Sequence, residues 1–445
     1  MNFKTLLHKN LVKVINCIFF FLLVFNCSSG GGDDSTPPIN NNDTTPPTVP
    51  TNLVSVNTTE TTTDLSWTAS TDNIAVQTYL IFKDGSNLLS NTSTSKTITG
   101  LDPNTTYTFK VQAKDTAGNT SGFSNEVSIT TPAVTAELQV ASGDIETYMD
   151  NIIDNVPGDS GDNYTVPSTN QLNIWSLVID AILAENISEA VSKSSEVNYQ
   201  ITEFTDTSLS PNQVFYILEE KSSQSNYWGT YVFSKTPTRD NLILMAPHIK
   251  NDTNTGKQAV YCFKNNVAKA VFISGTHRCN NSESSSCSGT TSTCGSSEAY
   301  RVSDMAHNTQ SAFQKTTENV LNTVSNSVFI QLHGFGKQPS DPYVILSNGT
   351  RETPTTDYAS LIKDALLIED NSLTFQLAHI NTNWTRLIGF TNTQGRLINA
   401  SADHCSTSAT TTSGRFIHIE QEKSKLRNDA AGWIKMSNAL GSVFN

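Results

Sequence analysis

The sequence has few charged residues and no basic stripe. Charged side chains make up only 16% of the 445 residues, and the formal net charge is −13. Nucleic-acid phosphates and anionic lipid surfaces repel such a chain, which excludes a nucleic-acid-binding protein. The apolar share of 36% is also low for compact globular domains. Because Ser, Thr and Asn are abundant instead, the composition is typical of a polar, loop-rich exported protein.

Two further absences exclude classes of fold and of catalytic mechanism. No internal repeat of the solenoid or propeller type runs through the sequence. No GxSxG segment is present, so the nucleophile turn of serine hydrolases is not expected. With 445 residues the chain is too long for one hydrophobic core, and two or three domains are expected.

Residues 1–26 have the anatomy of an export signal. Three lysines precede the apolar run Val14–Phe25, which is too short for a comfortable membrane span. The run stops just before Cys27. This arrangement resembles the signal of bacterial lipoproteins, although Asn26 stands where a small residue is usual, and the resemblance implies a lipid on Cys27. An ordinary cleaved signal followed by an incidental cysteine is the alternative.

A polar segment follows the cysteine. Residues 27–48 are mostly Ser, Gly, Asp, Asn, Thr and Pro, which cannot build a core, so we expect a tether. Its Gly-Gly-Gly-Asp-Asp stretch resembles the surface-export tag of Bacteroidetes lipoproteins. These features predict an exported protein that contacts the outer membrane or cell surface through an N-terminal lipid.

Residues 49–132 alternate short strands with turn clusters, at the spacing of an all-β sandwich. The stretch ITGLDPNTTYTFKVQAKDTAGNTS resembles a fibronectin type III domain. The resemblance implies that Tyr107 forms the tyrosine corner and that Leu101, Phe109 and Val111 face the core. It also implies a spacer, or a module that contacts carbohydrate or protein. The segment has no His and no Cys, so we expect no catalysis there.

Residues 140–445 mix helical and strand patterns. Residues 140–210 are expected to form a helical lead-in, because apolar residues recur at helical spacing over 144–153 and 172–190. The other expected elements are strands near 214–218, 227–233 and 242–245, and a helix over 305–324. The order strand, helix, strand favours an α/β domain with a mixed sheet.

Three apolar runs in this region each end on an ionisable residue. They read NLILMAPH, SVFIQLH and RFIHIE, and each is typical of a buried strand. Open α/β sheets bind ligands at the carboxyl ends of their strands. We therefore expect His248, His333 and Glu420 to converge on one site despite their wide separation in sequence.

Asp252, four residues after His248, completes a set of two imidazoles and two carboxylates. That set suits a catalytic zinc with three protein ligands, an open position for water and a separate general base. Each residue also has a simpler interpretation. His248 would cap a turn, Asp252 would be the N-cap of the next helix, and Glu420 would be a charge on an edge strand.

The order of these residues resembles the zinc amidohydrolase and carboxypeptidase superfamily, and within it N-formylglutamate amidohydrolase. The resemblance spans about residues 241–430 and rests on a Pro-His at a strand end, a carboxylate soon after, a later strand ending in His, and a late strand carrying Glu. It implies that His248, Asp252 and His333 hold Zn²⁺ and that Glu420 is the base. An Asp in place of the family's Glu is a departure from its pattern.

Arginine and histidine residues between these positions are candidates for substrate binding. Arg278 would clamp a substrate carboxylate through two hydrogen bonds. His307 would stabilise the oxyanion of the tetrahedral intermediate. The simpler interpretations are an ion pair between Arg278 and Asp304 and a surface-helix position for His307. Weaker candidates for the same roles are Arg386, Arg415 and His277.

Five cysteines follow the position of the expected lipid, and in an oxidising compartment such residues usually pair. The disulfide candidates are Cys279, Cys287, Cys294 and Cys405. Three of these lie in a Ser- and Thr-rich insert, residues 279–297, which also departs from the family pattern. Since five is odd, Cys262, within an expected apolar strand, is expected to be a buried free thiol. A zinc knuckle is the alternative for the insert, although its spacings match known patterns poorly.

Two classes of function follow from these patterns. In the first, the chain is a cell-envelope zinc hydrolase that cuts an amide bond in a small molecule, a peptide or a cell-wall fragment. In the second, it is a non-catalytic adhesion or ligand-binding lipoprotein on a fibronectin type III stalk. Every expected metal role is filled by a chemically competent residue, which favours the hydrolase.

Overall fold

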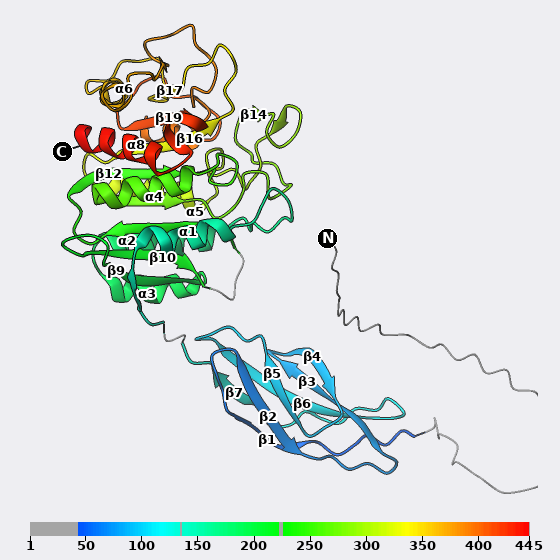
Figure 1. The fold of residues 1–445 in the computed structure, drawn as a ribbon. Helices are drawn as coiled ribbons and strands as arrows, with labels where there is room; N and C mark the ends of the chain where they lie inside the picture. Colours follow the sequence, from blue (N-terminus) through cyan, green and yellow to red (C-terminus); the bar gives the residue numbers. More distant parts are fainter. Residues whose placement is uncertain (1–42, 134–135, 222–225, 445) are drawn as a thin grey trace, which may run out of the picture. The chain divides into compact units, whose positions relative to one another are not determined.

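The computed structural model describes residues 43–133, 136–221 and 226–444 (Figure 1). The expected signal peptide, Cys27 and most of the expected tether lie outside the described residues. Among the described residues, no helix has the length and apolar character needed to cross a bilayer. The chain divides into two compact units, residues 1–132 and 133–445.

The first unit is a sandwich of two antiparallel sheets. One sheet has the order β1-β2-β5 and the other β4-β3-β6-β7. The strands are β1 (Thr51–Val56), β2 (Thr62–Thr68), β3 (Val76–Lys83), β4 (Ser86–Asn91), β5 (Ser95–Thr99), β6 (Thr106–Asp115) and β7 (Val127–Thr130). Alternate residues of β6 are buried, among them Tyr107, Phe109 and Val111. The amide of Asp102 donates to the Tyr107 hydroxyl at 2.9 Å, which confirms the predicted tyrosine corner.

The second unit is built around one ten-stranded mixed sheet. Its order is β18-β17-β19-β16-β12-β13-β11-β10-β9-β8. The strands are β8 (Gln139–Gly143), β9 (Tyr199–Asp206), β10 (Gln213–Glu220), β11 (Thr230–Ser234), β12 (Arg239–Ala246), β13 (Ala268–Ile273), β16 (Val328–Phe335), β17 (Val344–Ser347), β18 (Phe375–Leu377) and β19 (Phe416–Glu422). Strands β13, β12, β16 and β19 are mutually parallel, whereas β9, β10 and β11 pair antiparallel. The predicted α/β class with a mixed sheet is therefore confirmed.

Helices cover both faces of this sheet (Figure 1). One face carries α1 (Ile145–Asn155), α4 (Thr255–Asn266), α6 (Tyr358–Glu369) and α8 (Ala430–Val443), and the other carries α2 (Thr169–Leu183), α3 (Ile187–Glu196), α5 (Ala312–Thr323) and α7 (Thr393–Ile398). Successive residues of β12 point to opposite faces: Leu244 belongs to the first core and Met245 to the second. Burying each such side chain contributes about 1.5–3 kcal/mol, which favours the three-layer arrangement.

Several predicted elements have different bounds in the structure. The helix expected over 172–190 is two helices, α2 and α3, because Glu185 adopts a left-handed conformation with φ of 58°. The helix expected over 305–324 begins only at Ala312, where the Ser311 side chain accepts from Gln314 N. The region 140–210 is not purely helical, since it supplies β8 and β9 to the sheet edge.

Candidate metal centre

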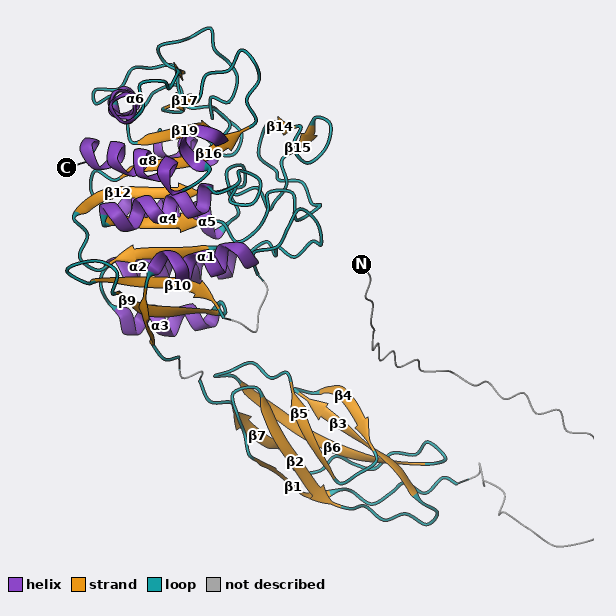
Figure 2. Cartoon of the chain, viewed as in Figure 1, coloured by secondary structure: helices purple, strands orange, loops and turns teal. Residues whose placement is uncertain are grey.

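The central parallel strands β12, β16 and β19 place the predicted residues at one edge of the sheet. His248 follows the end of β12, while His333 and Glu420 lie near the ends of β16 and β19 and are direct partners in register. Asp252 lies one turn beyond His248, and its amide donates to the His248 carbonyl at 2.7 Å. Long loops, including the hairpin of β14 (Thr290–Thr291) and β15 (Glu298–Ala299), gather beside this edge (Figure 2).

Three acceptor atoms of this group form a small triangle. The Nδ1 atoms of His248 and His333 are 3.1 Å apart. Asp252 Oδ2 lies 3.4 Å from His248 Nδ1 and 3.3 Å from His333 Nδ1. All three side chains are buried. Ligands at zinc distances of about 2.0–2.1 Å in a tetrahedral arrangement are separated by about 3.3 Å, so the triangle has the size of one face of a zinc tetrahedron.

The other nitrogen of each ring is held by an acceptor. His248 Nε2 donates to Asp304 Oδ1 at 2.8 Å, and His333 Nε2 donates to Gln331 Oε1 at 2.7 Å. The Asn392 side-chain amide also donates to Gln331 Oε1. This second donor fixes the orientation of the Gln331 amide, so that its oxygen faces His333. These bonds keep the protons on Nε2 and turn the two Nδ1 lone pairs toward each other. Arg278 Nη1 is 3.5 Å from His248 Nδ1, at the outer limit for a hydrogen bond, so a cation or an added proton would satisfy the triangle far better.

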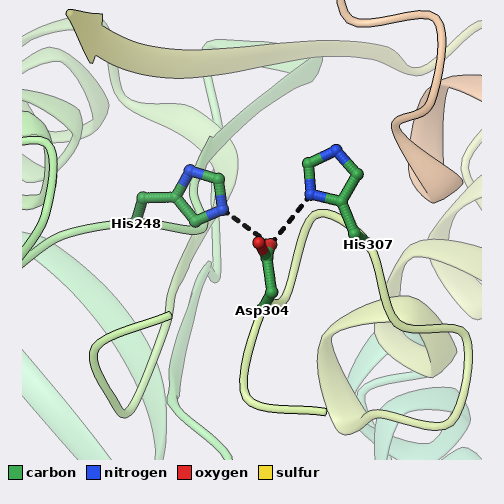
Figure 3. A group of neighbouring side chains, drawn as sticks. All are labelled: His248, Asp304 and His307. Atoms are coloured by element: carbon green, nitrogen blue, oxygen red, sulfur yellow. Dashed lines mark hydrogen bonds and ion pairs between the residues drawn. The ribbon is translucent and has the colours of Figure 1, made fainter. Parts of the chain in front are cut away.

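Asp304 organises the wall of the site (Figure 3). Besides His248, it accepts hydrogen bonds from His307 Nδ1 at 3.0 Å and from Arg278 Nε at 2.9 Å. Burial alone would raise the pKa of Asp304, but Arg278, His307 and His248 hold it well below its usual value. The ion pair between Arg278 and Asp304 is therefore present, and His307 is buried in the loop before α5 rather than on a helix surface.

Charge also sets the protonation of the triangle. Burial and the Arg278 guanidinium oppose protonation of His248, but Asp304 and Asp252 outweigh them and raise its pKa above the ordinary value. Burial lowers the pKa of His333 to about 4. Burial would raise the pKa of Asp252, but the adjacent His248 and His333 imidazoles keep it well below normal. Asp252 is therefore an anion that faces one neutral and one readily protonated imidazole.

Glu420 lies beside the triangle with unused hydrogen-bonding capacity. Its Oε2 atom is buried and has no hydrogen-bond partner, and His418 Nε2 lies 3.7 Å from Oε1. Burial, and then the Asp252 carboxylate, raise the pKa of Glu420 well above its usual value. The loop at Gly389, where φ is 67°, passes very close to His418. A Cβ atom on residue 389 would lie 2.9 Å from His418 Cγ. The structure thus places a buried carboxyl group with a raised pKa next to His418, which the loop at Gly389 closely covers.

A cavity of about 780 Å³ opens onto these residues. Its floor contains His248, Asp252, His333, His418 and Glu420, and its walls contain Asn251, Arg278, Thr290–Thr293, Tyr300, His307, Gly334–Gly336, Gln338 and 385–391. Arg386 is part of the wall and pairs with Asp341 at 2.7 Å. The cavity combines two guanidinium groups with many hydroxyl groups, so it suits a polar or anionic substrate.

Two substrate-binding candidates lie elsewhere. Arg415 directly precedes β19, so it lies at the opposite end of that strand from Glu420 and does not line the cavity. At a rise of about 3.3 Å per residue, the five intervening steps separate the two positions by about 16 Å. His277 lines a neighbouring cavity, where its Nδ1 accepts from Cys279 N. Neither side chain contacts the triangle.

Two disulfides shape the insert. Cys279 pairs with Cys294 within it, and Cys287 pairs with Cys405 in a distant loop. All four sulfur atoms are thereby occupied, which removes the zinc-knuckle alternative. Cys262 is a buried free thiol, but it lies on α4 rather than on a strand as predicted.

Sequence reasoning missed three residues of the site: Asp304 as a partner of His248, Gln331 and His418. One signal was available for the last two. Gln331 and His418 each lie two residues before a predicted site residue on the same strand, and residues two apart share a face. Asp304 gave no comparable signal, because it lies in an irregular loop.

Comparisons with known proteins identify the first unit. Residues 47–130 match the family model of the fibronectin type III domain, so that prediction is confirmed. Chitinase A1 of Niallia circulans is 45% identical over 100 residues, which cover 22% of this chain and 14% of that protein. Exoglucanase A of Cellulomonas fimi is 46% identical over 89 residues, which cover 20% of this chain and 10% of that protein. A solved structure of chitinase ChiA74 from Bacillus thuringiensis is 44% identical over 22% of this chain and 16% of that chain, with a TM-score of 0.20.

These likenesses are confined to part of each protein. The chain spans 14%, 16% and 15% of the length of the first three curated relatives, all of them chitinases. The fibronectin type III match ends at residue 130 and does not include the cavity or the triangle. The chemistry of residues 133–445 therefore has to be argued from their own geometry.

Proposed function

We propose that residues 133–445 form a zinc-dependent hydrolase that cleaves an amide bond. The observation that carries the proposal is the triangle of two imidazole nitrogens and one carboxylate oxygen, 3.1–3.4 Å apart, whose ring protons are held on the far side by Asp304 and Gln331. A buried arrangement of facing lone pairs is unfavourable in the absence of a cation. Its mixed nitrogen and oxygen donors suit zinc.

His248, Asp252 and His333 would hold the ion. Zinc bound there supplies a Lewis acid that makes water nucleophilic near neutral pH and polarises a carbonyl group. Glu420 would accept the proton of the attacking water and transfer it to the leaving amine. Burial, and then the Asp252 carboxylate, raise its pKa well above the usual value, so this carboxyl group binds a proton more strongly than an exposed glutamate does.

Arg278 would bind an anionic group of the substrate. Asp304 fixes its guanidinium from one side, while the side chain still lines the cavity. The amide specificity rests on the resemblance of about residues 241–430 to zinc amidohydrolases, together with the pairing of a metal triangle and a separate carboxyl group. A non-catalytic binding protein has no need for an unpartnered buried glutamate beside such a triangle.

The protein would act in the cell envelope. The lysine-rich start, short apolar run and Cys27 support export and a lipid anchor, and radiolabelled palmitate should label the chain but not Cys27→Ala. The fibronectin type III domain would serve as a spacer or as a contact to carbohydrate or protein.

Metal analysis of the full-length chain tests the proposal. The purified chain should hold about one zinc, and His333→Ala should hold almost none, because it removes one of three ligands. His404→Ala is the matched control and should retain zinc, since it removes a histidine outside the triangle and the cavity. Glu420→Gln should retain zinc and lose turnover of acyl-amino-acid or peptide amides by a factor of about 10²–10⁴. A parent chain without zinc would exclude the hydrolase and leave the binding-protein alternative.

A further inference from the structure

A second cavity, of about 470 Å³, lies beside the cavity that contains the triangle. The two cavities share Asn251 and Thr293 in their walls. Asn251 Nδ2 donates to Asp252 Oδ1 at 2.8 Å, so one of the shared wall residues contacts a proposed zinc ligand. The second cavity therefore borders the candidate metal centre directly.

A buried side chain and a disulfide hold the walls of this second cavity in place. Asn280 lines it with an exposed fraction of only 1%, and its Nδ2 donates to the carbonyls of Gly158 and Ser160 at 2.9 and 3.0 Å. The Cys279–Cys294 disulfide, whose two residues both line the cavity, closes the insert. The cavity is thus preformed, as ligand pockets usually are.

The lining of the second cavity is polar. It includes charged residues of both signs, among them Asp162 and Arg301, and hydroxyl groups such as that of Ser282. His277 Nδ1 accepts from the Cys279 amide at 3.1 Å, so the neutral ring keeps its proton on Nε2 as a donor. Such a lining suits the carbonyl and N–H groups of a peptide, whereas a fatty acyl chain would leave these polar groups without partners.

The order of the strands places this cavity and Glu420 on opposite sides of the triangle. Neighbouring strands follow the order β19-β16-β12-β13. Glu420 lies on β19, His333 lies on β16, His248 follows β12 and His277 follows β13. Three steps of about 4.8 Å between strands separate β19 from β13 by about 14 Å. A substrate that reaches from Glu420 to the second cavity therefore has to cross the metal centre.

We propose that the second cavity is a subsite for the acyl side of the substrate, and that the substrate is a peptide. The inference rests on the proposed function: Glu420 gives its proton to the leaving amine, so that amine lies on the Glu420 side and the acyl side points to the second cavity. An extended chain spans about 3.3–3.6 Å per residue, so about four residues cover the 14 Å. Contacts so far from the bond that breaks raise kcat/KM, because they hold the substrate in the reactive geometry.

Turnover of a series of probes tests the subsite. Each probe releases alanine and carries on its amine an acetyl group, one to three alanine residues capped by acetyl, or an octanoyl group. With the zinc-loaded full-length chain, kcat/KM should rise by at least about tenfold from acetyl-alanine to the longest peptide. The octanoyl probe should not share this gain, because its chain forms no hydrogen bonds with the lining.

Ser282→Trp should fill the second cavity. Ser282 is exposed and lines this cavity but not the one that contains the triangle. An indole there should reduce the ratio of kcat/KM between the longest and the shortest probe to about one. Ser296→Trp is the matched control and should keep the parent ratio, since this exposed serine of the same insert lines neither cavity. Circular dichroism and zinc content would show that both variants fold.

A binding measurement supports the kinetic one. Glu420→Gln should bind the probes without cleaving them, so calorimetry with this variant should show affinity rising with peptide length. Cleavage of all probes at the same kcat/KM, or a parent ratio that persists in Ser282→Trp, would overturn the subsite and leave the hydrolase intact. A gain with octanoyl-alanine equal to that with the longest peptide would overturn the peptide assignment. A zinc-loaded chain that cleaves none of the probes would instead overturn the proposed function, and the subsite with it.

Discussion

At the scale of single residues, the site depends on where two protons are held. His248 and His333 would bind a metal through Nδ1 only because Asp304 and Gln331 fix their protons on Nε2. Carboxylate and amide partners of this kind orient the ring and raise the basicity of the free nitrogen. The geometry of the proposed ligands is thus set by residues that would not touch the ion.

Asp304→Asn should reveal this dependence. The amide keeps the size of the side chain but removes the charge that holds Nε2–H and Arg278 in place. We expect zinc affinity to fall by about 10–100-fold while the chain stays folded. Competition with a zinc chelator would measure it. Asp341→Asn, which breaks the pair with Arg386 at the cavity wall, is the control and should leave zinc affinity unchanged.

Zinc affinity should also depend on pH in a stated direction. A ligand must lose its proton before it binds metal, so protons and zinc compete. Because the pKa of His248 is raised, this competition begins above its ordinary value of 6.5 as the pH falls. His333, with a pKa of about 4, contributes only in stronger acid. Chelator titrations between about pH 8 and 5 should show affinity falling by about tenfold per unit below the His248 pKa, and a flat profile would contradict the assignment.

The sequence allowed the candidate ligands to be predicted as neighbours in the fold, but not their hydrogen-bond partners. His248, His333 and Glu420 end apolar runs, and the rule on strand ends turns that local pattern into a shared location. Asp304 contributes through hydrogen bonds that arise only in the folded chain, and no local pattern predicts them. Arg415 was misplaced because its position at the start of a strand directs it to the other edge of the sheet.

At the scale of elements, strand patterns were more informative than helix limits. The strands β12, β16 and β19 each contain consecutive apolar residues because both of their faces are covered by helices. The break between α2 and α3 depends instead on the left-handed conformation of Glu185, a residue type that gives no sign of it. Helical periodicity continues across such a break, so the sequence predicted a single helix.

Gly275 joins two elements through a close backbone contact. A Cβ there would lie 2.5 Å from Gly229 N and 2.5 Å from Tyr227 O, where β11 begins beside the end of β13. Gly275→Ala should therefore destabilise this unit by about 1–3 kcal/mol, because backbone atoms have to move apart. Urea unfolding would measure the change. Gly158→Ala is the control and should leave the free energy of unfolding almost unchanged, because its Cβ would meet nothing within 4 Å. Equal stability of the two variants would show that the close contact at Gly275 is unimportant.

At the scale of the whole molecule, disulfides compensate for a polar, loop-rich chain. Cys287–Cys405 encloses 118 positions, whereas Cys279–Cys294 encloses 15. Longer closed loops remove more unfolded-state entropy, about 4.7 kcal/mol for 100 residues against about 3 kcal/mol for 15. A variant with serine at both Cys287 and Cys405 should therefore melt at a lower temperature than a variant with serine at both Cys279 and Cys294. Scanning calorimetry would measure both, and the reverse order would contradict the loop-length argument.

The cross-link between Cys287 and Cys405 also sets an order of assembly. A chain made from its N-terminus presents Cys287 118 residues before its partner, while Cys279 and Cys294 are already beside it. During that interval, Cys262, Cys279, Cys287 and Cys294 are all present as thiols, and the pairing of Cys279 with Cys294 leaves Cys287 available for Cys405. Thr290–Thr293, between the two cross-linked cysteines of the insert, form part of the cavity wall. The loop at the entrance to the candidate site is therefore tied down only after residue 405 has been made, and β19, which carries Glu420, follows still later.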